Sequence, residues 1–392
     1  MDFELSAEER AFEAEVERFL EANRSPDVMD ECPEQLSQTV DTPAKRAFMR
    51  KLAERGWLGM SWPKQYGGQE RPGIYDFILT EALSRFGAPQ PGKGVGIVGK
   101  TLIRHGNETL KQYFLPRIIR GEIEFAIGYS EPQAGSDAAN MQLRAVRDGA
   151  GWRLTGQKIW TTSAHFADWY WVGARTDPDA PKHRGITLFL IRMDDPGLTV
   201  RPTWTIGDER TNEVFFDGVW VSDDFVVGEP NRGWTYICEA LDLERFAMMP
   251  IGPLEMKLEA LCGWVRSARR DGEPLRRDPS VRSQMARFAT QLEVARGLQR
   301  RVVSEAVKGR VPTVESSKYK LYMNELGKRL ADCALDLIGA AGQLKPAEDG
   351  APLGGRFERS YRYTVVDTIG GGTSEIQKNI IARRGLGLPP SY

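Results

Sequence analysis

The order in which hydrophobic periodicity changes along the 392 residues is the feature that most limits the fold. Residues 1–122 carry apolar side chains at helical spacing, residues 123–229 carry short β-prone runs between turn signals, and residues 230–392 return to helical spacing. Strands do not alternate with helices, so a parallel nucleotide-binding sheet is not expected. The pattern predicts a multi-domain α+β protein with a helical domain at each end and a middle antiparallel β domain.

Apolar spacing, capping residues and breakers place the individual elements. In the first domain, helices are predicted after the Ser6–Glu9 capping box and over 43–55, 74–86 and 110–119. In the second, strands are predicted over 125–129, 142–146, 152–155, 169–174, 185–191, 213–220 and 225–227. In the third, helices are predicted over 236–267, 281–308 and 314–338, with a last one after Gly372.

Charge and hydropathy exclude several classes of partner. Lys and Arg number 53 against 54 Asp and Glu, so no global positive field exists to hold a nucleic acid. The longest apolar stretches, such as Ile186 to Ile191, are too short to span a bilayer. The first residues, MDFELSAEER, lack the basic-then-apolar order of a signal peptide, so we expect a cytoplasmic protein.

Cysteine and histidine usage gives no support for a disulfide framework or a metal site. The cysteines lie far apart without CxxC spacing, and the histidines form no HExxH motif. They are Cys32, Cys238, Cys262, Cys333, His105, His165 and His183.

Residues Gly94 to Thr101, GVGIVGKT, match the phosphate-loop pattern letter for letter. A phosphate loop needs a buried strand before it, and the preceding residues RFGAPQPGK do not form one. The interpretation we favour is a helix-start loop packed under the β domain. A nucleotide hydrolase using Lys100 is the alternative function of a different class.

Three other segments combine small residues, hydroxyls and an aromatic ring. IGYSEPQAGSD, Ile127 to Asp137, ends a strand and opens a glycine-containing loop. GQKIWTTSA, Gly156 to Ala164, sets Trp160 beside two threonines. IGGGTSEIQKNIIARRGLG, Ile369 to Gly387, opens a helix whose N-terminus favours an anionic group. Taken alone, the first segment can be an ordinary turn, the second a stretch around a core tryptophan and the third a helix cap. Taken together, they suit the binding of an isoalloxazine ring and a pyrophosphate.

These segments, with WPKQYGG early in the chain and LDLER after the strands, resemble in their order the acyl-CoA dehydrogenase family over nearly the whole sequence. The resemblance implies an N-terminal helical domain (1–122), a middle β domain (123–229) and a C-terminal helical bundle (230–392). It also implies FAD as cofactor, an acyl-CoA substrate, a 2,3-enoyl-CoA product and an electron-transfer flavoprotein as electron acceptor.

The resemblance implies roles for single residues. Tyr129 and Ser130 would hold the pyrimidine end of the flavin, and Gly135 and Ser136 would approach the phosphates. Trp160 would shield the ring, with Thr161 and Thr162 supplying hydroxyls near it. The remaining implied contacts are Thr373 and Gln377 with FAD, and Ser136, Arg245, Gly370 and Gly371 with the substrate.

The catalytic base is where the sequence departs from most of the family. The usual glutamate of a YEGT-like segment is Gly371 here, which cannot accept a proton. A minority of the family, including isovaleryl-CoA dehydrogenases, carries the base within LDLER, where this chain has Glu244. The resemblance therefore implies that Glu244 removes the α proton and that the Gly371 backbone N–H binds the thioester oxygen. Without the resemblance, the Glu244–Arg245 pair would be read as a solvated surface pair.

A second departure concerns the residues that reach a neighbouring subunit's FAD. The stretch VRSARRDGEPL, Val265 to Leu275, lacks the family's Phe-Gly pair, and Arg269 or Arg270 matches its arginine only loosely. The later glutamine and paired glycines are replaced by Asp336 and the segment 339–342. This asymmetry resembles the heteromeric acyl-CoA dehydrogenases of actinobacterial steroid side-chain degradation. It implies an α2β2 heterotetramer with a homologous subunit and a bulky acyl substrate. A non-catalytic scaffold subunit of the same family is the remaining alternative.

Overall fold

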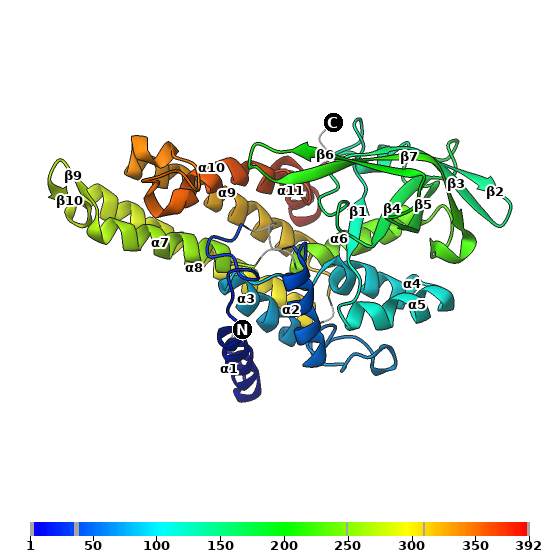
Figure 1. Cartoon of the computed structure of the whole chain (residues 1–392), viewed down its shortest axis with the longest axis horizontal. Coiled ribbons are helices and arrows are strands. Elements are labelled where there is room, and N and C mark those ends of the chain that lie inside the picture. The colour runs from blue at the N-terminus through cyan, green and yellow to red at the C-terminus, as the bar shows by residue number, and fades with distance from the viewer. Residues whose placement is uncertain (1–3, 35–38, 248–249, 309, 390–392) are drawn as a thin grey trace.

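The computed structural model describes residues 4–34, 39–247, 250–308 and 310–389, without the side chains of residues 242–247 and 307. It is an α+β protein in which a β-sheet domain at one end of the molecule packs against helices from the two ends of the chain (Figure 1). The N-terminal helices are α1 (Ala7–Ala22), α2 (Pro43–Glu54), α3 (Ile74–Arg85), α4 (Lys100–His105) and α5 (Glu108–Ile119). The predicted capping box is confirmed, since Ser6 and Glu9 bond each other's backbone N–H groups.

The middle of the chain forms one mostly antiparallel sheet, as predicted. Its order is β6-β7-β3-β2-β4-β5-β8, and β1 pairs in parallel with β4. The strands are β1 (Phe125–Gly128), β2 (Arg144–Asp148), β3 (Gly151–Lys158), β4 (Trp169–Arg175), β5 (Ile186–Arg192), β6 (Leu198–Trp204), β7 (Arg210–Ser222) and β8 (Val226–Val227).

Each predicted run overlaps a strand, with ends that differ by at most three residues, but the sequence patterns missed the edge strand β6. Strand β6 contains Pro202 and is largely exposed, so it lacks both the continuous apolar character and the donors of an interior strand.

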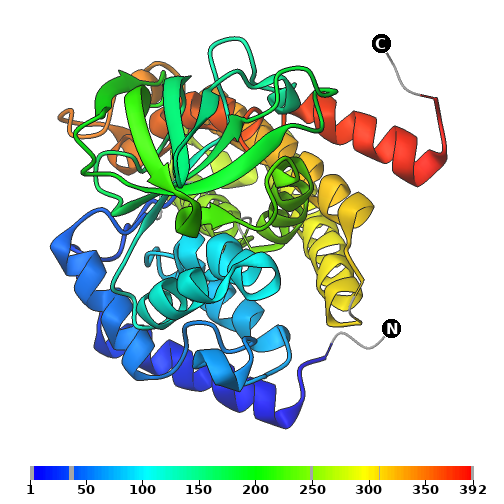
Figure 2. The ribbon, with the colours of Figure 1, turned by 90° about the vertical axis from the view of Figure 1, so that its right-hand side faces the viewer.

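The C-terminal helices are α6 (Gly233–Ala247), α7 (Gly252–Ser267), α8 (Pro279–Val307), α9 (Thr313–Ile338), α10 (Arg356–Asp367) and α11 (Ser374–Ile380). The single helix predicted over 236–267 was wrong: it is two helices, and α7 begins afresh with Pro253 in its first turn. Helices α7, α8 and α9 share one apolar core. The last helix projects past α9 and away from the rest of the molecule (Figure 2).

The segment that matches a phosphate loop is a π-helix, η2 (Gly94–Gly99), which runs directly into α4. Its glycines allow close packing: a Cβ on Gly99 would lie 2.2 Å from the Trp62 ring, and one on Gly94 would lie 3.2 Å from the Phe125 ring. No strand leads into it, and its backbone N–H groups serve the helix. The structure therefore excludes the phosphate-loop alternative.

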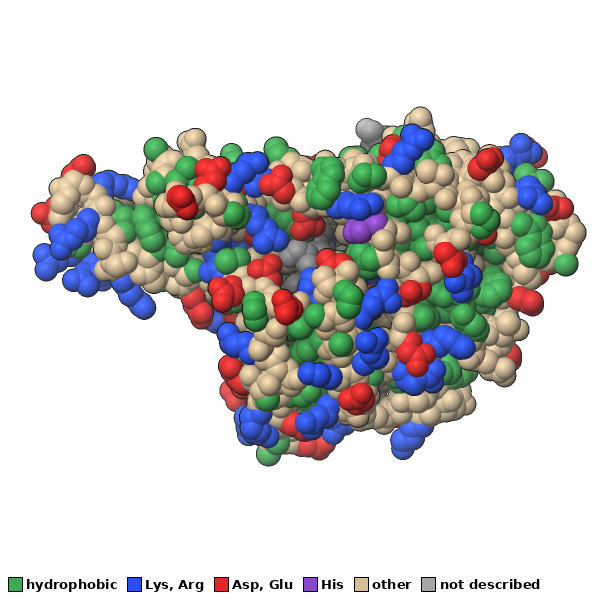
Figure 3. Space-filling model, viewed as in Figure 1, with side chains coloured by type: hydrophobic (Ala, Val, Ile, Leu, Met, Phe, Trp, Pro, Cys, Tyr) green, Lys and Arg blue, Asp and Glu red, His purple; other side chains and the backbone are tan. Residues whose placement is uncertain are grey.

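The face of the molecule seen in Figure 3 carries interspersed charges of both signs. No helix among the described residues is long and apolar enough to cross a membrane. Within the same residues, no group of three or more His, Cys, Asp or Glu side chains is placed to bind a metal ion.

Candidate active site

The first predicted cofactor segment leaves the end of β1 and turns back at once. The Tyr129 hydroxyl accepts a hydrogen bond from Trp171 Nε1 at 2.7 Å, which fixes the phenol ring against β4. Glu131 and Ala134 exchange both backbone hydrogen bonds at 3.0 Å and close the turn. Gly135 and Ser136 beyond the turn are exposed, so their polar groups are available to a ligand.

The second predicted segment follows β3. Trp160 adopts a φ of 61°, which a bulky residue rarely takes, and its ring is 55% exposed. Thr161 is fully buried, its hydroxyl 2.9 Å from the Tyr170 hydroxyl and its backbone paired with Asn212. Thr161 therefore anchors the segment, and this anchoring holds Trp160 in a strained, outward-facing conformation.

A buried ion pair joins these two segments. Lys158 and Glu131 are 0% and 5% exposed in their side chains, with Nζ 2.7 Å from Oε1. Lys158 also donates to the Tyr129 carbonyl at 3.2 Å. The Ile159 N–H donates to the Ser130 carbonyl at 3.0 Å, so the strand ends that carry Ser130 and Trp160 are held side by side.

Glu131 satisfies its remaining acceptor capacity on backbone groups, including the Leu143 N–H at 2.8 Å. Burial lowers the pKa of Lys158 to about 8, while the Glu131 carboxylate opposes that shift. Because both charges are buried and hydrogen-bonded, loss of one would leave the other uncompensated.

The third predicted segment lies at the start of α11. Gly371 and Gly372 have φ values of 66° and 94°, a region that favours glycine. Thr373 caps the helix by accepting from the Ile376 N–H at 3.2 Å. Gln377 is fully buried and donates to the Gly372 carbonyl at 3.0 Å, yet none of the described residues forms a hydrogen bond with its Oε1.

Helix α6 carries the LDLER segment. It packs against η2, β5 and α9, at the junction of all three domains. The side chains of Glu244 and Arg245 lie outside the described residues, so their predicted roles rest on the sequence. No hydrogen bond within the described ranges joins the segment 370–377 to the two β-domain segments. The C-terminal helices do contact the β domain through α10, where Arg362 donates to the Ile206 carbonyl at 2.7 Å in the β6–β7 turn.

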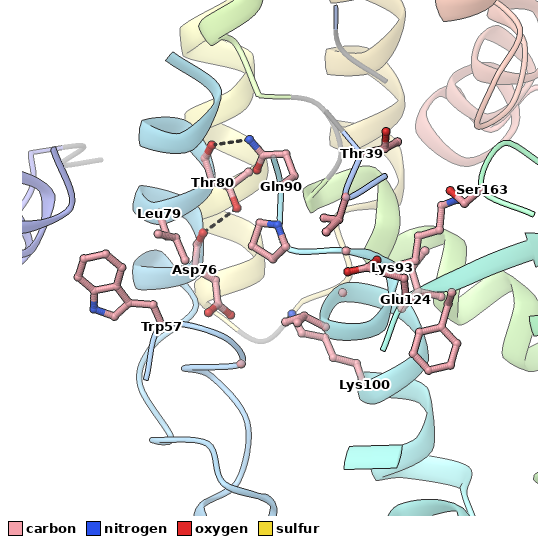
Figure 4. A pocket seen from close by; sticks show the side chains of 18 of the residues that line it. Thr39, Trp57, Asp76, Leu79, Thr80, Gln90, Lys93, Lys100, Glu124 and Ser163 are labelled. Atoms are coloured by element: carbon pink, nitrogen blue, oxygen red, sulfur yellow. Dashed lines mark hydrogen bonds between the residues drawn. The ribbon is translucent and has the colours of Figure 1, made fainter. Parts of the chain in front are cut away.

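A cavity opens between the N-terminal helices and the β domain (Figure 4). Its empty volume is about 1100 Å³, including the open mouth. Ser163 and Phe166, just after Trp160, form one wall, and η2 forms another. Burial raises the pKa of Glu124, on the β-domain side, to about 7.

Sequence reasoning did not single out this cavity. Its wall comes from six separate stretches of the chain. Only one of them, the glycine-rich η2 segment, carries a recognisable motif, and that motif belongs to phosphate binding. Its polar and charged wall residues are Thr39, Asp76, Thr80, Gln90, Lys93, Lys100, Glu124 and Ser163.

Replacing Lys158 by Met is expected to lower the free energy of unfolding by roughly 3–5 kcal/mol, because Glu131 would keep a buried, unpaired charge. Urea denaturation measures this. Replacing Lys182, which pairs with Asp137 at the surface, by Met is the control and should cost about 1 kcal/mol or less. Adding Glu131→Gln to Lys158→Met should recover part of the loss. Equal destabilisation by the two lysine changes would contradict the assigned importance of the buried pair.

Three family models match the chain in order. They are the N-terminal domain of acyl-CoA dehydrogenase over residues 6–122, its middle domain over residues 126–219 and its C-terminal domain over residues 231–386.

Individual proteins agree with the family models. The chain is 34% identical to the acyl-CoA dehydrogenase FadE26 of Mycobacterium tuberculosis over 351 residues, which cover 88% of each chain. The solved structure titled Tcur3481-Tcur3483 steroid ACAD aligns over 100% of both chains with 34% identity and a TM-score of 0.89. The ChsE4-ChsE5 complex of Mycobacterium tuberculosis aligns over 100% of both chains with 30% identity and a TM-score of 0.89. This chain, an oxidoreductase with the fold of a flavoprotein, belongs to the acyl-CoA dehydrogenase family.

Proposed function

We propose that the chain is the FAD-binding, catalytic subunit of a heteromeric acyl-CoA dehydrogenase that oxidises bulky acyl-CoA thioesters to 2,3-enoyl-CoA. The observation that carries the proposal is the pair of β-domain segments held together by Lys158 and Glu131, one of which presents the exposed Trp160 ring. We also propose domain boundaries after residues 122 and 229, and an electron-transfer flavoprotein as the electron acceptor.

The residues present fit a flavin. An exposed indole beside a half-buried Thr162 offers a stacking wall and a hydroxyl, and exposed Gly135 and Ser136 can approach phosphates. The buried Gln377 Oε1 lacks a partner, which is costly unless a ligand or a neighbouring subunit supplies one. We propose that Tyr129, Ser130, Thr161 and Thr373 complete this cofactor site.

The proposed chemistry assigns each step to a residue of this chain. When bound, FAD accepts the β hydrogen of the acyl group as hydride. Glu244 removes the α proton, and burial under the substrate would raise its pKa and strengthen it as a base. The Gly371 N–H, on an exposed residue without a side chain, stabilises the developing negative charge on the thioester oxygen. Ser136, Arg245 and Gly370 are the other proposed substrate contacts.

Replacing Glu244 by Gln is expected to lower turnover by at least ~100-fold while preserving the fold and bound FAD, since an amide cannot accept the proton. Single-turnover bleaching of the flavin by acyl-CoA measures the step directly. Glu239→Gln is the matched control on the same helix, where Glu239 pairs with His105 at 2.7 Å, and it should leave turnover near normal. Near-normal turnover of Glu244→Gln would favour the scaffold alternative or another base.

The preference for bulky acyl groups, with steroid side-chain esters as the leading class, rests on the small residues around the site. Gly96 lines the cavity, and a Cβ there would meet nothing within 4 Å. The glycines at 370–372 replace larger residues common in the family. The relative titled a steroid ACAD supports the same class.

We therefore expect kcat/KM to be higher for bulky or branched acyl-CoA than for butyryl-CoA. Gly96→Val should lower kcat/KM for bulky esters by about tenfold, because lost cavity volume cannot be recovered in a packed wall, and should leave butyryl-CoA almost unaffected. Gly263→Val changes an exposed glycine of α7 that also faces open space and serves as the control. The highest kcat/KM for butyryl-CoA in the wild type would refute the preference.

The two arginines that would have to reach the FAD of an identical neighbouring subunit support a heteromeric assembly. Arg270 donates to the Leu337 carbonyl at 2.9 Å and Arg269 to the Gly272 carbonyl at 2.7 Å, so both guanidiniums bind carbonyls of their own chain. The hairpin that bears them extends from the end of α7 (Figure 1).

Helix α10 also leaves an apolar stripe for a partner to cover. Tyr361 and Val365 of α10, and Ile369 just beyond its end, recur at a spacing of four residues and are exposed. Trp204 at the end of β6 and Ile206 in the following turn are exposed as well. A related subunit that supplies the missing arginine, glutamine and glycines could cover this surface and complete the cofactor site.

Coexpression with a homologous acyl-CoA dehydrogenase subunit should yield a soluble, yellow α2β2 complex with about half as many flavins as polypeptides, because only this chain forms the β-domain half of a complete site. The chain expressed alone should be insoluble or poor in FAD. Flavin absorbance and mass determination by light scattering measure both quantities. A fully active homotetramer with one FAD per chain would overturn the assembly.

A further inference from the structure

The wall of the cavity beside η2 includes charged side chains, which a pocket for a purely hydrocarbon group would not need. Asp76 comes from α3, Lys93 and Lys100 flank η2, and Glu124 precedes β1. Pockets for small molecules are mostly apolar, with a few placed polar groups that fix orientation and specificity. Figure 4 shows Asp76 and Thr80 on one side, Glu124, Lys93 and Ser163 on the other, and Lys100 between them.

Three of the four charges have compensating contacts within the described residues. Asp76 accepts from the Ser61 hydroxyl and lies in the first turn of α3, where the helix dipole favours a carboxylate. Lys93 Nζ donates to Ser163 Oγ at 3.1 Å. Glu124 is stabilised by the charges of Lys93 and Arg46.

Lys100 is different, since no described residue forms a hydrogen bond or ion pair with its ammonium group, although Lys100 is partly buried and lines the cavity. An ammonium group at a cavity wall carries three hydrogen-bond donors. A ligand whose oxygen accepts from one of these donors forms a more stable complex with the protein than a ligand without such an oxygen.

The charge balance of the wall limits what that oxygen can be. Two lysines face two carboxylates, so the cavity has no large positive excess. A carboxylate ligand would be repelled by Asp76 and, in its ionised form, by Glu124. A neutral carbonyl or hydroxyl oxygen accepts from Lys100 without that repulsion.

The position of the cavity indicates which part of a substrate would reach it. It adjoins the residues just after Trp160, and η2 packs against α6, which bears Glu244. An acyl group whose α carbon lies between Trp160 and Glu244 can therefore extend its far end into this cavity. Gly96 widens the cavity one turn of helix before Lys100.

We infer that the acyl group of the substrate carries a neutral, hydrogen-bond-accepting oxygen, a ketone or a hydroxyl, at its far end, and that Lys100 binds this oxygen. The inference rests on the proposed function and names the substrate class of the same site. Lys100 is thus a specificity-determining residue, remote from the bond that is oxidised.

The test uses the FAD-loaded complex and four cyclohexyl-terminated acyl-CoA esters that differ only at the far ring carbon, which bears hydrogen, a ketone, a hydroxyl or a carboxylate. Kd is measured by calorimetry and kcat/KM by dye reduction. The wild type should bind the ketone or the hydroxyl ester about tenfold more tightly than the hydrocarbon ester, the scale of a hydrogen bond to a charged group. The ketone and hydroxyl arms decide which oxygen is preferred.

Lys100→Met should remove this preference, leaving Kd for the hydrocarbon ester within about twofold, because Met keeps the length and apolar stem of Lys. Lys64→Met, at a side chain that is 74% exposed and does not line the cavity, should retain it. Should Lys100→Met fail to fold, the comparison of the four esters in the wild type still decides.

Equal affinity of the wild type for all four esters, tightest binding of the carboxylate, or an equal loss for every ester in Lys100→Met would each overturn the inference. These outcomes differ from a failure of the proposed function, in which none of the esters would be oxidised and no flavin would bind.

Discussion

The ion pair between Lys158 and Glu131 is the interaction on which the candidate site depends. Its two charges are almost completely buried and 2.7 Å apart. Lys158 also donates to the Tyr129 carbonyl in the loop after β1, and Glu131 also accepts from the Leu143 N–H just before β2. Such a pair contributes little net stability over an apolar replacement, but it tolerates no single loss. The sheet thereby holds the loop after β1 and the loop after β3 in one geometry, with the Trp160 ring facing outward.

Close packing around glycines gives the second constraint. In η2, Gly94 and Gly99 let the π-helix approach Phe125 and Trp62, whereas Gly96 faces open space and leaves room for a ligand. The same segment lines the cavity and packs against α6, the helix that carries LDLER. At the other end of the site, Gly371 and Gly372 adopt left-handed conformations that a glutamate in this position would make strained.

The parts of the candidate site differ in how fully this chain alone satisfies their hydrogen bonds and covers their apolar surface. The β-domain half is held by hydrogen bonds among its own residues. By contrast, Gln377 Oε1 has no hydrogen-bond partner in the part of the chain that the structure describes, and the apolar stripe beside α10 is exposed. A buried acceptor without a donor and an exposed apolar face are both unfavourable in an isolated subunit. Both would be relieved by cofactor and partner binding, which connects the chemistry of the site to its assembly.

Local sequence patterns were enough for the domain order, the antiparallel sheet and most helices, because these follow from periodicity, caps and breakers that act over a few residues. The Ser6–Glu9 capping box and the β1 strand before Tyr129 are examples. The edge strand β6 escaped detection because Pro202 and solvent exposure remove the strand signal, and the helix over 236–267 appeared continuous because apolar spacing persists across the break before α7.

Long-range contacts decided the rest. Lys158 in isolation looks like a surface lysine of an exposed strand face, and only the return of the chain at Glu131 places a carboxylate beside it in the core. By its local sequence, Lys100 belongs to a phosphate-binding pattern. In the structure no strand precedes this segment, Gly99 packs on Trp62, and Lys100 lines a cavity instead. Spacing along a chain specifies local backbone geometry, whereas burial and charge pairing depend on residues far apart in sequence, so the electrostatics of this site emerge only when the domains pack together.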